Sequence, residues 1–498
     1  MSLNAGLEQA SKIADRLCAR EPASPSQITA LARDFCAQYT ALQLSDRARL
    51  MSRLGADWAV DHDELRLVAE KYLHSSTNED RSLVADRLLD ASKPKFRQLI
   101  KAIGTVRDGI RFLVDMRADL QTCLQKRVLA DNETADAMQK HLRVFDLHLR
   151  LLLTLWFTTG LLTLRRLTWQ SPSDVLQLVS ESEAVHPLRD WLDLRRRLGT
   201  DRRCFVFMHQ AMPRVPLVVL HVALTNHVPD NIHSIIQQAR LVVWRLADNL
   251  PSESEETSES IDTAVFYSIS ATQPGLRGID LGNHLIKRVV HELTAELAHV
   301  HTFSTLSPIP GFARWLRTAL RDKGRRDDVF ERALIHHLNE VFKGFVAQND
   351  SDCLAALYST LFSGDNRWYD NAEMREKLAP VLMHLCARYI CTEKHRSFAL
   401  DPVANFHLRN GAIVWRLNYA ANLSDQGLRS SCGMMANYRY YTEDLERNSQ
   451  LYFVEKTLKT SDSVQRLLDF ESARQKFEER SLIGSSFERR RNHAKPRL

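Results

Sequence analysis

The spacing of apolar residues changes character once along this 498-residue chain, near Arg203. Between about residues 26 and 198, apolar side chains recur every three or four positions, as at Leu65, Val68 and Tyr72, and β-branched runs are almost absent. That period places the apolar side chains on one face of a helix. Several such helices with short connections predict an all-helical bundle over residues 1–200.

Short β-branched runs appear after Arg203, and they are typical of buried strands. The runs that predict strands cover residues 204–207, 217–224, 265–270, 412–417 and 435–441. After the third run, the apolar positions from Leu285 to Leu297 trace the inner face of a helix. The sequence therefore predicts an α+β protein with a second domain of α/β type over residues 201–480 and a basic tail over residues 481–498.

Charge and length argue against several classes of protein. The chain has 67 Lys and Arg against 61 Asp and Glu, and its formal net charge of +6 gives no reason to expect a nucleic-acid partner. The longest uncharged apolar stretch, residues 151–164, is too short to span a bilayer. The eight cysteines are scattered without zinc-site spacing, so we expect a reducing compartment and no metal.

The two ends of the sequence bear on the compartment. The first residues lack the apolar core of a signal peptide, and Glu8 and Asp15 argue against an acid-poor transit peptide. The last three residues, Pro496-Arg497-Leu498, resemble a peroxisomal tripeptide of the S-K-L type, with proline in place of the usual small residue. Cytosol, peroxisome and mitochondrial matrix are all compatible with this sequence.

A glycine-bearing segment between a predicted strand and a predicted helix is the most informative local motif. It consists of Arg277, Gly278, Ile279, Asp280, Leu281, Gly282 and Asn283. Backbone N–H groups converge on an anion at such a junction, and the helix dipole adds to the attraction. The segment resembles the R-x-x-G-x-G/A loop with which acetyltransferase-like folds hold the pyrophosphate of coenzyme A.

Asp280 stands where glycine is usual in that loop. An acid facing a pyrophosphate would repel it, so we expect Asp280 to turn away or to cap the helix together with Asn283. The segment matches neither G-x-x-x-x-G-K-[ST] nor G-x-G-x-x-G, which leaves no support for an NTPase or a dinucleotide site. The alternative interpretation is that the two glycines serve only a tight turn.

Two further segments carry groups that could act chemically. Ser307 lies between prolines in residues 303–312, where the fixed backbone would hold its hydroxyl rigidly. No G-x-S-x-G motif surrounds it, and a serine before proline is often only a turn former. His407 lies in residues 405–411, and a single histidine is more often packed or at the surface than catalytic.

Taken together and in order, these segments resemble the malonyl-CoA decarboxylase family. The matching stretches are residues 183–187, 202–204, 216–225, 267–290, 303–312, 393–396, 405–408 and 437–440. The resemblance implies a helical N-terminal domain that mediates assembly into a homotetramer and a C-terminal acetyltransferase-like (GNAT-type) catalytic domain. It places the catalytic serine on Ser307, the catalytic histidine on His407, and the malonyl-CoA-binding residues on Arg277 to Asn283 together with Ser307 and His407.

The chemistry of that family agrees with these residues. Malonyl-CoA loses carbon dioxide through a thioester enolate, so neither a metal nor an organic cofactor is obligatory, and coenzyme A is part of the substrate. We expect Ser307 to hold the malonyl carboxylate or to accept a proton, and imidazolium His407 to protonate C2. Arg416 and Arg439 could steady an oxyanion or a phosphate, or could be structural members of ion pairs.

Two other functions stay open at this point. The first is a coenzyme-A-dependent N-acyltransferase, because acetyltransferases share the loop that holds the pyrophosphate. The second is a non-catalytic sensor that binds malonyl-CoA and docks partners through its helical domain. Release of carbon dioxide without an amine acceptor would distinguish a decarboxylase from both.

Overall fold

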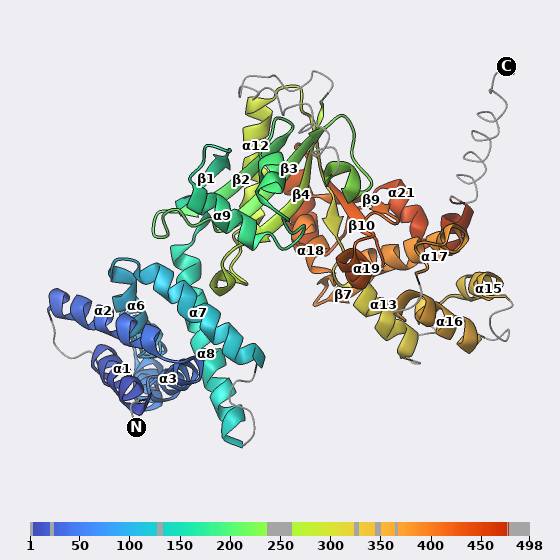
Figure 1. The fold of residues 1–498 in the computed structure, drawn as a ribbon. Coiled ribbons are helices and arrows are strands. Elements are labelled where there is room, and N and C mark those ends of the chain that lie inside the picture. Colours follow the sequence, from blue (N-terminus) through green and yellow to red (C-terminus); the bar gives the residue numbers. More distant parts are fainter. Residues whose placement is uncertain are drawn as a thin grey trace, which may run out of the picture.

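The computed structural model describes residues 3–19, 24–126, 133–236, 261–322, 328–343, 350–363, 367–475 and 477. A helical bundle lies to one side of a domain built on a mixed sheet (Figure 1). The α+β class predicted from the sequence is therefore confirmed. The predicted basic tail, residues 481–498, lies outside the described residues together with its C-terminal tripeptide.

The bundle is formed by the first eight helices. These are α1 (Leu3–Cys18), α2 (Pro25–Ala41), α3 (Leu44–Asp57), α4 (His62–His74), α5 (Asn78–Ala91), α6 (Arg97–Thr105), α7 (Gly109–Lys126) and α8 (Glu133–Trp156). The start of α2 is stabilised by a capping box, in which Ser24 and Gln27 each bond the other's backbone N–H. Phe35, Phe96 and Phe145 are fully buried between the helices, as the helical period predicts.

The sheet domain contains an eight-stranded sheet and a separate two-stranded sheet, β7 (Lys394–His395) with β8 (Phe398–Ala399). The strands of the large sheet are β1 (Leu162–Leu167), β2 (Arg202–His209), β3 (Val218–Thr225), β4 (Thr263–Ala271), β5 (Thr302–Thr305), β6 (Ser307–Pro308), β9 (Ile413–Asn418) and β10 (Met435–Tyr440). Their order is β1-β2-β3-β4-β5-β10-β6, with β9 paired to β10. All pairs are antiparallel except β4 with β5.

One secondary-structure prediction is wrong. Residues 162–167 were expected to be helical, but they form β1, which pairs with β2 across its whole length. The sheet therefore begins upstream of residue 200, directly after a short helical turn at Thr159–Leu161 that follows α8. Only the first and last residues of β1 are buried, and that pattern suits a strand at the edge of a sheet.

Helices cover the sheet and extend the domain (Figure 1). Their bounds are α9 (Ser173–Ser182), α10 (Trp191–Arg197), α12 (Asn283–Glu296), α13 (Phe312–Arg321), α15 (Arg332–Val341), α16 (Asp350–Phe362), α17 (Ala372–Cys391), α18 (Pro402–Arg409), α19 (Asp425–Ser431), α20 (Leu445–Gln450) and α21 (Asp462–Gln465). Shorter helical turns are η2 (Pro274–Leu276), η3 (Leu451–Glu455) and η4 (Arg466–Leu468). Within the described ranges, no helix combines the length and the apolar character that a membrane crossing needs.

Candidate active site

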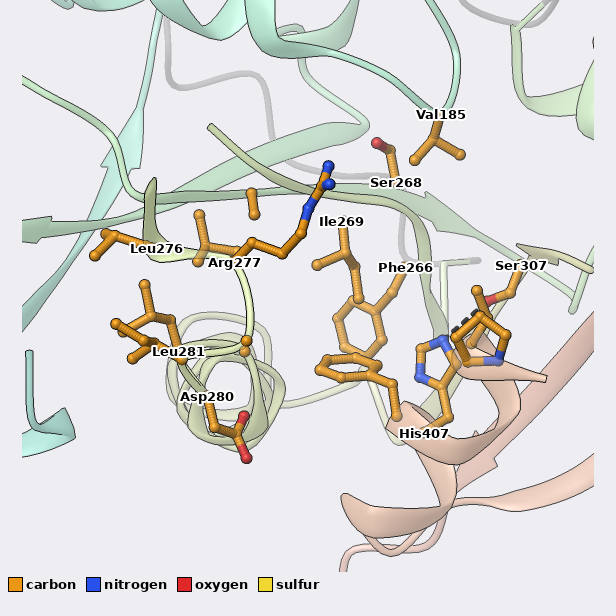
Figure 2. Close-up of a pocket in the computed structure, with 18 of the residues that line it drawn as sticks. Val185, Phe266, Ser268, Ile269, Leu276, Arg277, Asp280, Leu281, Ser307 and His407 are labelled. Atoms are coloured by element: carbon orange, nitrogen blue, oxygen red, sulfur yellow. Dashed lines mark hydrogen bonds between the residues drawn. The ribbon is translucent and has the colours of Figure 1, made fainter. Parts of the chain in front are cut away.

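A cavity of about 470 Å³ brings together the segments that the sequence singled out (Figure 2). Its walls come from β4, from residues 273–282 after that strand, from Ser307 and Pro308 of β6, and from the first turns of α18, which carry His407. We call residues 277–282 the glycine loop, and every one of them lines the cavity. The predicted site residues from Arg277 to Gly282, Ser307 and His407 therefore share one pocket.

Asn283 is the exception among the predicted binding residues. It begins α12, and its side chain lies outside the described part of the chain. Gly282 is the N-cap of α12 and has no side chain with which to bond the first turn, and capping of this helix by Asp280 together with Asn283 stays a prediction. Asp280 lines the cavity at the end of the glycine loop, apart from Ser307 and His407 (Figure 2).

Each of the two glycines in the loop is needed for a different structural reason. Gly278 has a φ of 79°, a left-handed conformation that side chains other than glycine rarely adopt. Gly282 packs against the ring of Phe406, and a Cβ there would lie 2.7 Å from that ring. The second glycine thus lets the loop and α18 approach each other, which closes one wall of the cavity.

Ser307 lies where a strand is interrupted. β10 pairs with β5 through Arg439 and Tyr440, and with β6 through Met435 and Ala436, so β5 and β6 act as one strand broken at a single residue. Two bonds across the break support it: the backbone N–H of Tyr438 donates to Thr305 Oγ1 at 3.0 Å, and Asn437 Nδ2 donates to the Thr305 carbonyl at 2.6 Å. The Ser307 hydroxyl on β6 faces α18.

His407 on α18 contacts that hydroxyl. Its Nε2 lies 3.0 Å from Ser307 Oγ, and its Nδ1 lies 2.7 Å from the hydroxyl of Tyr440. The imidazole also stacks on Tyr438, with ring centroids 4.6 Å apart. No sequence pattern predicted a role for Tyr440, although this residue lies in one of the stretches that carry the family resemblance. Tyr440 and Tyr438 are two positions apart on β10, so both rings lie on the face of the strand that meets His407.

The hydrogen positions follow from the number of hydrogens each group has. Ser307 Oγ donates to Thr305 Oγ1 at 2.9 Å, and a hydroxyl has only one hydrogen to give. Ser307 then accepts from Nε2–H of His407, and Nδ1 accepts from the hydroxyl of Tyr440. This arrangement aims the one N–H of a neutral imidazole at Ser307.

Burial makes that imidazole neutral. Because His407 is completely enclosed, its pKa is lowered to about 3, and burial raises the pKa of the Tyr440 hydroxyl well above its usual value. The imidazole of the free protein is therefore neutral near neutral pH, and the imidazolium expected to protonate C2 stays a prediction for the substrate complex. The physical reason is that the described residues around the ring offer hydroxyls and aromatic faces and no carboxylate to stabilise a positive charge.

Asp401 links the two segments that carry Ser307 and His407. Its Oδ1 caps α18 by accepting from the N–H groups of Val403 at 3.0 Å and Ala404 at 2.9 Å. Its Oδ2 accepts from the hydroxyl of Tyr389 at 3.4 Å, and the backbone of Gly311, four residues after Ser307, also bonds this carboxyl. Burial raises the pKa of Asp401 to about 6 in spite of these bonds.

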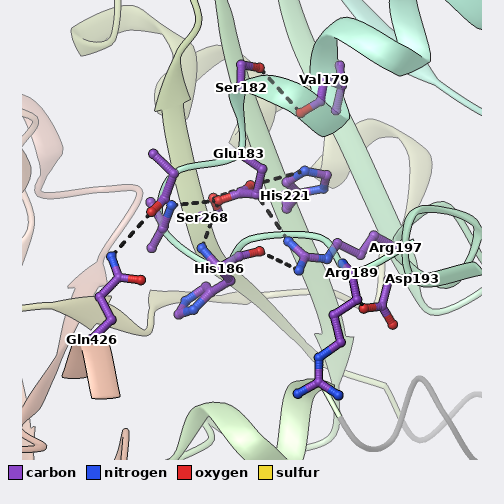
Figure 3. Close-up of polar contacts among 12 residues, drawn as sticks. Val179, Ser182, Glu183, His186, Arg189, Asp193, Arg197, His221, Ser268 and Gln426 are labelled. Atoms are coloured by element: carbon purple, nitrogen blue, oxygen red, sulfur yellow. Dashed lines mark hydrogen bonds and ion pairs between the residues drawn. The ribbon is translucent and has the colours of Figure 1, made fainter. Parts of the chain in front are cut away.

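A second buried polar cluster lies behind another wall of the cavity (Figure 3). The Glu183 carboxylate accepts from the Ser268 hydroxyl at 2.7 and 2.8 Å and from the backbone N–H groups of Val185 and His186 at 2.9 and 3.0 Å. Arg197 Nη1 lies 3.7 Å from this carboxylate. Val185 and Ser268 line the cavity, so Glu183 holds two parts of its wall from behind.

Other candidates from the sequence have structural roles. Arg416 donates to the side chain of Asn437 and to the carbonyls of Val228 and Pro229, and Arg439 stacks on Trp415. Neither arginine lines the cavity. Among the residues with described positions, no group of three or more His, Cys, Asp or Glu side chains is arranged to hold a metal ion.

Comparison with known proteins agrees with this geometry. The family model described as "Malonyl-CoA decarboxylase C-terminal domain" matches residues 160–478, and the one described as "Malonyl-CoA decarboxylase N-terminal domain" matches residues 58–157. Mitochondrial malonyl-CoA decarboxylase of Rattus norvegicus is 42% identical over 452 residues, which cover 89% of this chain and 86% of the relative. The same enzyme of Anser anser anser is 39% identical over 439 residues, covering 86% and 82%.

Solved structures give the same result. A crystal structure of malonyl-CoA decarboxylase from Rhodopseudomonas palustris matches with a TM-score of 0.76 at 30% identity, covering 94% of this chain and all of that one. The enzyme from Agrobacterium vitis matches with a TM-score of 0.72 at 28% identity, covering 92% and 99%. These findings define the class of this protein as a carboxy-lyase. More particularly, the chain belongs to the malonyl-CoA decarboxylase family.

Proposed function

We propose that this protein converts malonyl-CoA to acetyl-CoA and carbon dioxide in the cavity that contains Ser307 and His407. The observation that carries the proposal is the 3.0 Å contact between Ser307 Oγ and His407 Nε2, in a pocket whose opposite wall is the glycine loop. The loop would hold the pyrophosphate of coenzyme A with its backbone N–H groups. The acyl end would then reach the hydroxyl and the imidazole.

The first step is the loss of carbon dioxide. The bond between C2 and the malonyl carboxylate breaks, its electron pair moves into an enolate shared with the thioester oxygen, and carbon dioxide leaves. Ser307 turns its hydrogen from Thr305 to the carboxylate and holds that group out of the thioester plane, where the breaking bond overlaps the carbonyl. The apolar walls supplied by Val218, Phe266 and Ile269 withhold water from the charge, which favours its departure as neutral carbon dioxide.

The second step is protonation of C2. A carboxylate that enters the cavity beside His407 raises the pKa of the imidazole, so the ring takes up a proton together with the substrate. That proton passes from Nε2 to C2 of the enolate and gives acetyl-CoA. The Tyr440 hydroxyl on Nδ1 keeps the ring plane aimed at Ser307 throughout. One proton is consumed per turnover, as the overall reaction requires, and no cofactor takes part.

We also propose that the sheet domain is acetyltransferase-like (GNAT-type). The parallel pairing of β4 with β5 supports this, as does the position of the glycine loop between β4 and α12. In such a domain, the pantetheine arm would run along β4 toward Ser307, past Ile269 and Ser268 of the cavity wall. A structure with a non-hydrolysable malonyl-thioester analogue tests the path of the arm directly.

Assembly into a tetramer through the bundle is a further part of the proposal. Large apolar side chains are exposed on α4, α5 and α8, and a stable monomer would leave these in water. They are Leu67, Leu73, Leu83, Leu89, Val144, Leu147, Leu151 and Leu155. Sedimentation of the purified protein tests the assembly.

Of the three compartments, we propose the mitochondrial matrix, since the names of the relatives include the word mitochondrial. Imaging of the tagged chain tests this location.

The activity is tested by incubating the protein with malonyl-CoA and no amine acceptor. A decarboxylase releases carbon dioxide and acetyl-CoA in equal amounts. An N-acyltransferase would release neither until an amine is added, and a sensor would bind malonyl-CoA without turnover. Either of those two results would overturn the proposed function.

A further inference from the structure

The segment that leads into the glycine loop rests on the helical bundle. The turn η2 packs on α7, and the contact at Gly275 is so close that a Cβ there would lie 1.8 Å from the carbonyl oxygen of Val114. Figure 1 shows α7 and α8 on the side of the bundle nearest the sheet domain. The bundle therefore forms the support on which the glycine loop is built.

Arg117 of α7 is the centre of that support. Only 2% of its side chain is exposed, and Nη1 donates to the carbonyl oxygens of Gly275 at 2.6 Å and Arg277 at 2.9 Å. Its Nε donates to Asp146 of α8 at 2.9 Å. With its amide in the orientation that satisfies its neighbours, Gln121 donates to the carbonyl of Pro274 at 3.0 Å and accepts from Arg117 Nη2 at 2.9 Å. Side chains of α7 thus hold three carbonyls, those of Pro274, Gly275 and Arg277, where the chain enters the glycine loop.

Arg150 of α8 brings a second positive charge to the same place. A Cβ built on Gly278 would lie 3.9 Å from its Nη1. Burial lowers the pKa of Arg117 most, and the positive charge of nearby Arg150 lowers it further. Asp146 acts in the opposite direction and raises this pKa. Within the described part of the chain, Asp146 pairs with Arg117 and no carboxylate pairs with Arg150. A net positive charge therefore lies beside a loop whose backbone suits a phosphate.

We propose that the helical bundle is part of the malonyl-CoA site. Arg117 is a positioning residue that fixes the backbone of the glycine loop, and Arg150 supplies a cation to a phosphate of the bound coenzyme A. The identity of the ligand rests on the proposed function, but the two roles do not depend on turnover. Assembly of the bundle would accordingly affect substrate affinity through Arg117.

The role of Arg117 is tested with R117Q in the full-length protein, by steady-state kinetics and by calorimetric titration with coenzyme A. We expect KM for malonyl-CoA and Kd for coenzyme A to rise about tenfold or more, with kcat within about twofold, because a misplaced loop weakens binding without touching the reacting atoms. D146N, which frees Nε of Arg117 but keeps its charge, should give a smaller rise in the same constants. If R117Q does not fold, the rise in KM and Kd measured for D146N tests the role of Arg117 instead.

The matched control is R47Q in the same bundle. Arg47 also bonds two carbonyls, those of Tyr39 and Thr40, and one aspartate, Asp119, but none of these bonds goes to residues 274–282. Its replacement should lower thermal stability and leave KM and Kd unchanged. Equal rises in KM for R47Q and R117Q, or unchanged constants in both R117Q and D146N, would overturn the positioning role.

The role of Arg150 is tested by comparing coenzyme A with pantetheine, which has the arm but no phosphates. R150Q should weaken binding of coenzyme A about tenfold and leave pantetheine binding unchanged, and R150K should restore most of the loss. Equal effects on both ligands, or no effect on either, would contradict it. Because these are binding measurements, a wild-type protein that binds coenzyme A but releases no carbon dioxide would refute the proposed function and leave this inference standing.

Discussion

Nε2 of His407 lies 3.0 Å from Oγ of Ser307, although 100 positions of sequence separate the two residues. The contact depends on two local devices. The bond from Ser307 to Thr305 Oγ1 fixes the hydroxyl, and the Asp401 cap fixes the start of the helix that carries the imidazole. Both residues are buried, so their bond is formed before any substrate enters.

Replacing either residue should abolish catalysis and spare binding. For S307A and H407Q we expect kcat to fall by about 10²–10⁴, with Kd for coenzyme A within about threefold, because the pyrophosphate contacts are remote from both side chains. The control is H384Q. His384 is also buried with a lowered pKa, but it bonds the Leu467 carbonyl outside the cavity. A full kcat in H407Q would contradict the proposed proton transfer.

Tyr440 and Tyr438 form a matched pair of variants. Y440F removes the hydroxyl from Nδ1 of His407 and should lower kcat about tenfold, because the ring loses the bond that aims its N–H. Y438F keeps the ring that stacks on His407 and removes a buried hydroxyl that has no hydrogen-bond partner among the described residues. It should leave kcat unchanged. An unchanged kcat in Y440F would show that Tyr440 acts only through packing.

Asp401 should affect rate and stability differently according to the replacement. D401A removes the cap of α18 and should cost about 1–2 kcal/mol of unfolding free energy and lower kcat, since His407 loses its fixed position. D401N keeps an oxygen that can cap, and should restore most of both losses. Denaturant unfolding and initial rates check this. Equal losses of rate in the two variants would show that the charge, not the cap, matters.

Stability should fall as the solution becomes acidic. Burial lowers the pKa of His407 to about 3 and those of His186 and His221 to about 4, whereas an exposed histidine titrates near 6.5. Between these values the unfolded chain binds more protons than the folded one, so the free energy of unfolding decreases as pH falls from about 6.5 to about 4. Asp401, whose pKa is raised, acts in the opposite direction between about 4 and 6.

Unfolding midpoints in urea across that pH range measure the effect. H221Q, which removes one buried titrating ring, should have a flatter pH profile than the wild type. The same values predict that kcat/KM shows no histidine ionisation of the free protein between pH 5 and 8. A clear inflection near pH 6.5 would mean that His407 titrates as an exposed histidine does.

The Glu183 cluster should be intolerant of charge removal. E183Q leaves Arg197 buried without its carboxylate and should destabilise the protein by about 3–5 kcal/mol. The exposed pair of Arg214 with Asp174 is the control, and D174N should cost far less stability than E183Q. Thermal unfolding of both variants checks the difference. A small loss in E183Q would mean that water reaches Arg197.

Local sequence patterns predicted much of this fold, and their failures have physical causes. Apolar periods predicted the bundle and the strands β2, β3, β4, β9 and β10, since each has one or two buried faces. They missed β1 because an edge strand with Arg165 and Arg166 on its exposed positions resembles the end of α8. No local pattern could predict which distant segments lie close together. Arg117 bonds the Arg277 carbonyl across 160 positions of sequence. Only the family resemblance placed Ser307 and His407 in one site before the structure was known.

The edge position of β1 has a practical consequence for work with parts of this protein. A fragment that began at residue 201 would keep Ser307 and His407 but would strip the neighbour from β2, whose N–H and C=O groups would then be open to other molecules. Such a fragment is prone to self-association through that bare edge. One that began near residue 160 would keep β1 as the native edge strand, although it would still lack the bundle residues Arg117 and Arg150.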